Sequence, residues 1–348
     1  MKIISNILRS ALCFSVSGLI TTGQLQAAEF NFKLHHLLPP MSEVHTKIML
    51  PWAEKIEQES NGRIHIDVYP AMQLGGKPAQ LFDQARKGSA DITWTVAGYT
   101  PGRFRKSEVF ELPFMASSAE VTSQALQQFA TEEMTDDFRE VKLLAIHTNA
   151  TGVLHSRGKG IHKMEDLAGL KIRAPNKAMA EVYALMGASP IFMPAPQMSS
   201  ALSKGVLDVA SLSYDIVGPL KIHELTQSTT EISGDRGLYG QVFLFSMNKK
   251  SYLKLPKELQ QVIDNNSGIK LAAWMGRILD EMGAKGRTLV KDSGNEIIVL
   301  SADETRHWRE TAQPVIDAWM DDMNSDGEDG KKLYQRANQL IDQYGRKP

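Results

Sequence analysis

Cysteine is almost absent from this sequence, which has one, Cys13, among 348 residues. Cys13 lies in an N-terminal segment that we expect to be removed during export, so the mature chain would contain no cysteine. Disulfides, thiol nucleophiles and cysteine metal sites are therefore excluded from the mature protein. A lipid anchor on Cys13 is disfavoured as well, because the bulky Leu12 precedes it where a small residue is expected.

Apolar runs long enough to cross a bilayer are also missing. The run over residues 11–20 is shorter than the roughly 20 residues that a membrane span needs. Basic residues precede it and small residues follow it, which is the pattern of a cleavable secretory signal peptide. We predict a signal peptide at residues 1–28, cut after Ala27 or Ala28, and a periplasmic mature protein. The alternative is an amphipathic first helix of the folded domain.

An excess of charge of either sign is missing too, since 39 Lys and Arg oppose 40 Asp and Glu. Removal of the leader, with its two basic residues, changes the formal charge only from −1 to −3. No basic patch stands out, which argues against nucleic acid or anionic lipid as a partner.

The motifs of common enzymes and metal sites do not occur. There is no Gly-x-Ser-x-Gly, no His-Glu-x-x-His and no Gly-rich phosphate or dinucleotide loop. His35-His36 is a conceivable metal pair, but strand neighbours point to opposite faces, which favours one buried and one exposed histidine. A calcium-loop pattern that starts at Asp322 ends in Leu333 where a bidentate Glu is required. We therefore expect no catalysis, no metal and no cofactor.

Strand and helix patterns alternate along most of the chain. Apolar residues alternate over 64–69, as in a half-buried strand, and recur every fourth residue over 44–56, as in a helix that Pro51 kinks or restarts. The same patterns predict strands at 91–96, 141–147, 170–173, 190–193, 207–211, 240–248 and 296–300, and helices at 78–88, 118–140, 178–186 and 197–203. Such alternation indicates α/β sheets covered by helices, and the length suggests two lobes.

Three segments carry a more specific pattern. The first joins residues 74–76 and 85–92 to 110–114, the second is 165–175, and the third spans 186–208. In order and spacing they resemble the DctP family of solute receptors, which serve tripartite ATP-independent periplasmic (TRAP) transporters. The resemblance extends over nearly the whole mature chain.

The resemblance implies a two-lobed α/β periplasmic-binding-protein fold, with hinge strands between the lobes and a long late helix bracing both. We place lobe I at 29–150 plus about 238–280, lobe II at 151–237 plus about 281–320, and a C-terminal helical segment at about 321–348. It also implies capture of a small organic acid in the cleft and docking on the integral-membrane subunits of a sodium-driven TRAP transporter. We expect a monomer.

Arg173 ends the second segment's strand and is the residue that the resemblance assigns to the ligand's carboxylate. A guanidinium presents a planar fork of donors that matches a carboxylate with two parallel hydrogen bonds. Because the strand ends just before Pro175, the arginine head would emerge at a carboxyl end of the sheet. The alternative is an ion pair with a neighbouring acid such as Asp208 or Asp215.

Two positions depart from the family pattern. Gly152 stands where sialic-acid-type members carry a second arginine, and Leu212 stands where the family has a ligand-binding asparagine. The cleft has thus lost polar groups that serve sugar acids and dicarboxylates, and we predict a monocarboxylate or a zwitterion as ligand. Trp94, Tyr99 and Phe243 would pack a ring or face a cation, with core packing as the alternative for each.

Four further residues are candidates for ligand contact. Tyr214 and Asp215 begin an expected helix that faces the cleft, where Asp215 would pair with an amine or only stabilise the helix start. His36 and His155 would approach from one lobe each, as donors or acceptors. A periplasmic sensor that reports the solute to a receptor kinase fits the same features, and an exported α/β enzyme is the more distant alternative.

Overall fold

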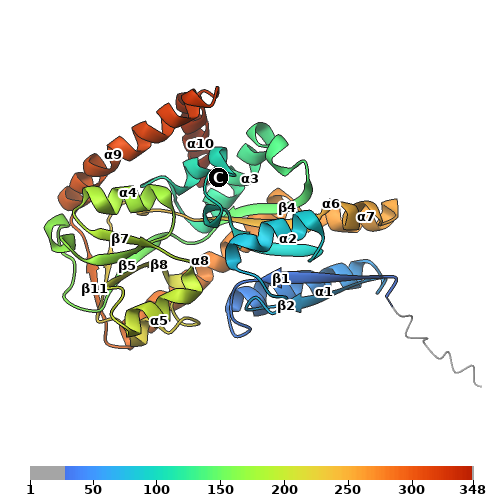
Figure 1. Cartoon of the computed structure of the whole chain (residues 1–348), viewed down its shortest axis with the longest axis horizontal. Helices are drawn as coiled ribbons and strands as arrows, with labels where there is room; N and C mark the ends of the chain where they lie inside the picture. Colours follow the sequence, from blue (N-terminus) through green and yellow to red (C-terminus); the bar gives the residue numbers. More distant parts are fainter. Residues whose placement is uncertain (1–27, 347–348) are drawn as a thin grey trace, which may run out of the picture.

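The computed structural model describes residues 28–346, so the predicted signal peptide lies, except for its last residue, outside the described residues. The described chain forms two β-sheets that lie side by side, each flanked by helices (Figure 1). No helix within residues 28–346 is long and apolar enough to span a membrane. The predicted two-lobed α/β class is confirmed.

The first sheet, in what we call lobe I, has the strand order β2-β1-β3-β10-β4. β1 pairs in parallel with β2 and β3, and β10 runs antiparallel to β3 and β4. The strands are β1 (Phe30–His36), β2 (Ile64–Tyr69), β3 (Ile92–Val96), β4 (Val141–Thr148) and β10 (Val242–Asn248). The helices of this lobe are the π-helical turn η1 (Val44–Met49), α1 (Leu50–Glu59), α2 (Leu81–Lys87), α3 (Ala119–Glu133), α6 (Lys249–Leu253) and α7 (Lys257–Asn265).

The second sheet, in lobe II, has the order β11-β9-β5-β8-β6-β7. β5 runs antiparallel to both β8 and β9, while β6 pairs in parallel with β7 and β8. The strands are β5 (Gly152–Ser156), β6 (Lys171–Ala174), β7 (Ser189–Phe192), β8 (Val209–Ser213), β9 (Ser228–Glu231) and β11 (Glu296–Val299), with α4 (Lys177–Leu185) and α5 (Met198–Ser203) among the helices.

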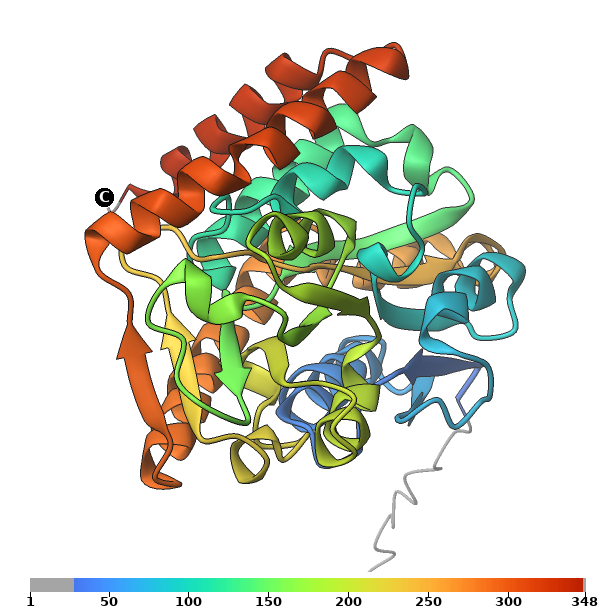
Figure 2. The same ribbon diagram turned by 60° about the vertical axis from the view of Figure 1, so that its left-hand side comes forward.

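Two long helices brace both lobes, α8 (Ile269–Asp292) and α9 (Ala302–Ser325). In α8, Gly276 lies against the backbone of Ala119 in lobe I and Gly286 against the backbone of Tyr214 in lobe II, so each contact needs a residue without a side chain. α9 leads from the lobe II sheet toward α3, and α10 (Gly330–Gly345) folds back along it (Figure 2). The predicted long late helix is therefore matched by α8, and α9 is a second brace.

Local differences from the sequence patterns have simple causes. The helix predicted to reach residue 140 ends at Glu133, where a short 3-10 turn leads into β4. Pro51 is the second residue of α1, which follows the π-helical η1 without a break, so the change from π-helix to α-helix falls at the proline. β9 was not predicted, because its sequence Ser-Thr-Thr-Glu lacks the apolar alternation of a half-buried strand.

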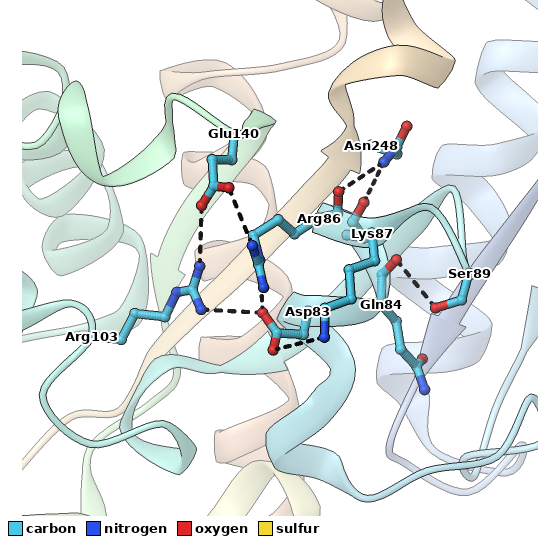
Figure 3. A network of polar contacts seen from close by, with 9 residues as sticks. Asp83, Gln84, Arg86, Lys87, Ser89, Arg103, Glu140 and Asn248 are labelled. Atoms are coloured by element: carbon cyan, nitrogen blue, oxygen red, sulfur yellow. Dashed lines mark hydrogen bonds and ion pairs between the residues drawn. The ribbon is translucent and has the colours of Figure 1, made fainter.

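A network of charged side chains fixes the segment that follows β3 (Figure 3). Arg103, in this segment, donates to Asp83 of α2 over 3.1 Å, and Arg86 donates to Glu140 over 3.2 Å. The Arg86 guanidinium beside Asp83 lowers the pKa of that carboxyl. Single surface ion pairs contribute little, but four groups joined in a network restrict where the segment lies. The segment carries Tyr99, which faces the other lobe.

Candidate ligand-binding site

A narrow cavity of about 10 Å³, roughly the space of one water molecule, lies between the two lobes. Both lobes and the brace α8 contribute to its wall, and the apolar core runs without interruption from one lobe to the other around it. The lining residues are Leu37, Leu38, Val44, Trp94, Val96, Tyr99, Asn149, Ala195, Asp215, Ile216, Gln241, Phe243 and Leu279. The lobes are thus in contact, in a closed arrangement.

An aromatic pair forms one wall of the cavity. Phe243 pairs with Val96 across β10 and β3, which puts it diagonally beside Trp94 on the same face of the sheet. The two rings are stacked with centroids 4.7 Å apart and planes at 11°. The indole N–H of Trp94 donates to Nε2 of His147 over 2.9 Å, and burial lowers the pKa of His147 to about 4, so this histidine is neutral and able to accept. With its N–H satisfied, the pair presents an apolar surface.

Arg173 is fully buried at the end of β6. Its Nε donates to the carbonyl of Met193 (3.0 Å) and its Nη1 to the carbonyl of Ser211 (2.9 Å), while Nη2 has no partner. Within residues 28–346 it forms no ion pair with any carboxylate, so neither Asp208 nor Asp215 neutralises it. The buried acid Glu111 is close enough for the Arg173 charge to lower its pKa in part, but it forms no ion pair with the guanidinium. A buried guanidinium without a direct acidic partner is costly, and an anion that accepts from Nη2 would offset that cost.

Two tyrosines add hydrogen-bond donors near this guanidinium. The hydroxyl oxygen of Tyr99 accepts from the backbone N–H of Ala195 over 2.9 Å, which leaves its own O–H free to donate. The hydroxyl of Tyr239 is buried and has no partner. Burial raises the pKa of both phenols, and the nearby Arg173 charge lowers it in part. Buried donors around a cation make an environment suited to a carboxylate.

Asp215 lies on the lobe II side of the cavity, in the 3-10 turn η8 (Tyr214–Ile216) instead of a regular helix. Its side chain is buried and Oδ1 has no hydrogen-bond partner. Burial raises the pKa of Asp215 to about 7, the Ser213 hydroxyl opposes this shift, and the charge of Asp280 adds to it. The cavity wall therefore contains one buried acid that has an oxygen without a partner and a pKa near physiological pH.

Four predicted contact residues do not line the cavity. Arg173 lies beside the lining residue Tyr99, and the other three form hydrogen bonds elsewhere. His36 bonds to His45 (2.9 Å) and stands edge-on to Trp94, so it lies behind the aromatic pair. His155 bonds to Thr229 over 2.8 Å inside the lobe II sheet. Tyr214 turns away from the cavity; its hydroxyl donates to Glu231 (2.7 Å).

The expectation of one buried and one exposed histidine at 35–36 is wrong. Both side chains are fully buried, because helices and loops cover both faces of β1. His35 bonds to the Gln84 side chain over 2.6 Å, and burial lowers the pKa of His36 to about 3, so it is neutral. No cluster of three or more metal-binding side chains occurs in the described part of the chain.

Sequence patterns did not reveal the polar residues at the crossings between the lobes. Asn149 follows β4 and Gln241 precedes β10. Asn149 accepts from the Gln241 backbone N–H (2.9 Å) and donates to the Ser213 hydroxyl (2.7 Å), so it links both crossings to β8. The only sequence clue was a polar residue directly at the end of an apolar strand.

The model of one protein family, described as bacterial extracellular solute-binding protein, family 7 (DctP), matches residues 34–322. The chain belongs to this family. Members are extracytoplasmic receptors that work with TRAP transporter subunits in the membrane, and the protein is accordingly a solute receptor and not an enzyme.

Solved structures of family members are similar over almost their whole length. A TRAP solute-binding protein specific for aromatic acids, from an unidentified marine microbe, was solved with 3-hydroxybenzoate; it is 42% identical with a TM-score of 0.90, over 92% of this chain and 100% of that one. A TRAP solute-binding protein of Rhodoferax ferrireducens, solved with copurified benzoate, is 41% identical with a TM-score of 0.88, over 90% and 98% of the chains. One from Bordetella bronchiseptica, with bound (R)- and (S)-mandelate, is 28% identical with a TM-score of 0.83, over 90% and 99%.

Proposed function

We propose that this DctP-family receptor captures an aromatic monocarboxylate in the cavity between its lobes and delivers it to a TRAP transporter. Residues 1–28 would act as a signal peptide, and the mature protein would work in the periplasm as a monomer. The hinge would lie in the crossings at residues 149–151 and 232–241, close to the lobe boundaries expected from the sequence. Mass spectrometry of the secreted protein would identify the cut after Ala27 or Ala28.

The observation that carries the proposal is the buried guanidinium of Arg173. Two of its nitrogens bind backbone carbonyls and hold its plane, while Nη2 remains for a ligand. Since no carboxylate of the described chain pairs with it, the site favours a ligand that brings one negative charge. A dicarboxylate would place its second charge in an apolar cavity that holds the acid Asp215 and no second cation in its wall.

The apolar part of the wall favours an aromatic ring as the remainder of the ligand. Trp94 and Phe243 offer ring faces and edges to a flat group, and Leu37, Ile216 and Leu279 complete an apolar surround. Solved relatives at 41% and 42% identity contain benzoate and 3-hydroxybenzoate, which supports the same ligand class here. We assign the carboxylate to Arg173 and Tyr99 and the ring to Trp94 and Phe243.

Thermal melting of ligand-stripped protein tests this proposal. The mature chain is purified in denaturant, refolded, and melted with benzoate, phenylacetate, succinate, benzylamine or leucine. Because only the folded state binds ligand, a ligand at 100 times its Kd stabilises it by about 2.7 kcal/mol. We expect benzoate or phenylacetate to raise the Tm and succinate and benzylamine to have no effect.

Arg173→Met should abolish the shift, and Arg173→Lys should leave only part of it, because an ammonium lacks the planar fork. Arg306→Met is the matched control, since Arg306 is exposed on α9 and pairs only with Asp303 one turn away. A Tm shift by benzoate that survives in Arg173→Met would contradict the assignment. Stabilisation by leucine alone would indicate a zwitterionic ligand whose amine faces Asp215.

A further inference from the structure

We infer that Asp215 recognises a hydroxyl group on the ring of the bound acid, so that the receptor selects hydroxylated aromatic carboxylates over unsubstituted ones. This inference rests on the proposed function and assigns the specificity of the same cavity. It follows from which polar atoms of the cavity wall have hydrogen-bond partners within the protein.

Most polar groups in the wall are already satisfied by the protein. The Trp94 N–H donates to His147, and both side-chain polar atoms of Asn149 have partners. The Tyr99 hydroxyl lies beside Arg173, at the carboxylate end that the proposed function assigns. Among the residues that line the cavity, Asp215 alone has a buried side-chain atom, Oδ1, without a hydrogen-bond partner.

An unpaired buried carboxyl needs a partner from the ligand, and a phenolic hydroxyl suits it in either protonation state. An ionised Asp215 accepts from the phenol O–H, and a protonated Asp215 donates to the phenol oxygen. Because burial brings the pKa of Asp215 to about 7, both forms occur near neutral pH. A ring without a polar substituent leaves the carboxyl buried and unsatisfied, and sites built for a hydroxyl discriminate strongly against such ligands.

The position of Asp215 is held from two sides, as a specificity residue requires. Gly286 of α8 lies directly against the backbone of Tyr214, which fixes the turn η8 to the brace. On the other side, Asn149 holds Ser213, two residues before Asp215, from the crossing between the lobes. The relative at 42% identity was solved in complex with 3-hydroxybenzoate and, as a surface mutant, with meta-hydroxyphenylacetate, two acids that carry a ring hydroxyl.

Isothermal titration of the ligand-stripped protein tests the inference. Benzoate is compared with 2-, 3- and 4-hydroxybenzoate, and with 3-methoxybenzoate, which has similar bulk but no O–H. In the wild type we expect at least one hydroxybenzoate to bind about tenfold more tightly than benzoate, the effect of one hydrogen bond to a charged group. In Asp215→Val this preference should disappear, while benzoate binds at least as tightly as before.

Two further variants guard against misfolding and general effects. Asp215→Asn keeps an acceptor oxygen and should retain part of the preference. Asp317→Val makes the same change at an exposed aspartate of α9, which accepts from Gln313 one turn away, and should behave as the wild type. The inference is overturned if no hydroxybenzoate binds the wild type better than benzoate, or if Asp215→Val keeps the preference. Failure of every aromatic acid to bind the wild type would instead overturn the proposed function, and this inference with it.

Discussion

Arg173 and Asp215 are two buried ionisable side chains in one small site, each with a polar atom that the protein leaves unsatisfied. Such groups cost free energy in the ligand-free fold, because burial removes water that would otherwise solvate them. Binding sites commonly accept this loss of stability, since the ligand later satisfies the same atoms. The stability of the ligand-free protein should therefore respond to changes at these positions.

The stability cost of Asp215 should depend on pH. Its pKa is raised to about 7 in the folded protein, against about 3.9 for an unperturbed aspartate. The folded state keeps this proton between those values while the unfolded chain loses it, so stability falls as the pH rises through this window and levels off above it.

Ligand-free Asp215→Asn should therefore be more stable than the wild type at pH 8. Its advantage in free energy of unfolding should shrink by about 2–3 kcal/mol at pH 5. Urea unfolding at both pH values measures this difference, and Glu111, whose pKa burial raises to about 8, is present in both proteins and cancels. An advantage that is the same at both pH values would show that Asp215 does not titrate in this window.

At the level of elements, α8 connects the binding site to both lobes through its glycines. Gly276 and Gly286 are ten positions apart and contact backbone in lobe I and lobe II, respectively. A glycine inside a helix normally costs about 1 kcal/mol relative to alanine, so its presence here reflects the closeness of these contacts. The helix therefore fixes η8, and with it Asp215, at a defined height in the cavity wall.

Gly286→Ala tests this role of α8. Its new methyl group would overlap the carbonyl of Tyr214, so we expect destabilisation by about 1–3 kcal/mol despite the better helix propensity. The preference for hydroxybenzoate should weaken too, because η8 must move. Gly345→Ala is the control, since its nearest neighbour, a methyl group of Val121, is 3.7 Å away. A Gly286→Ala protein as stable and as selective as the wild type would rule out this function of the brace.

For the whole molecule, a closed cavity implies that the lobes separate to admit a ligand. The lobes meet through the bond from the Ala195 N–H to Tyr99 and through a shared apolar core. Within residues 28–346 the chain crosses between them at 149–151, at 232–241 and along α8, and α9 then leads back from lobe II to lobe I. This arrangement allows one lobe to rotate on the other without breaking either sheet.

Small-angle X-ray scattering of ligand-stripped protein measures this motion. We expect the radius of gyration to decrease when benzoate is added, with a forward scattering that corresponds to a monomer throughout. Arg173→Met should show no decrease, because the ligand cannot draw the lobes together. An unchanged radius of gyration in the wild type, at a benzoate concentration that raises the Tm, would mean that closure is not linked to binding.

The sequence by itself determined the α/β class, the family and the position of most elements. These depend on local periodicity and on motifs such as 165–175, whose residues are neighbours along the chain. It also singled out Arg173, Trp94, Tyr99, Phe243 and Asp215 as candidates, and the structure places all five at or beside one cavity.

Tertiary structure alone decided which side chains face that cavity and which are satisfied elsewhere. The sequence suggested His36, His155 and Tyr214 as contact residues. Their side chains instead bond to His45, Thr229 and Glu231 within the lobes. Asn149, Gln241 and Tyr239 belong to the crossings between the lobes. These crossings have no periodic pattern, so the sequence did not indicate the three residues. Whether a polar atom has a partner depends on residues far away along the chain, and so no local pattern could reveal that Arg173 and Asp215 each retain an unpaired buried atom.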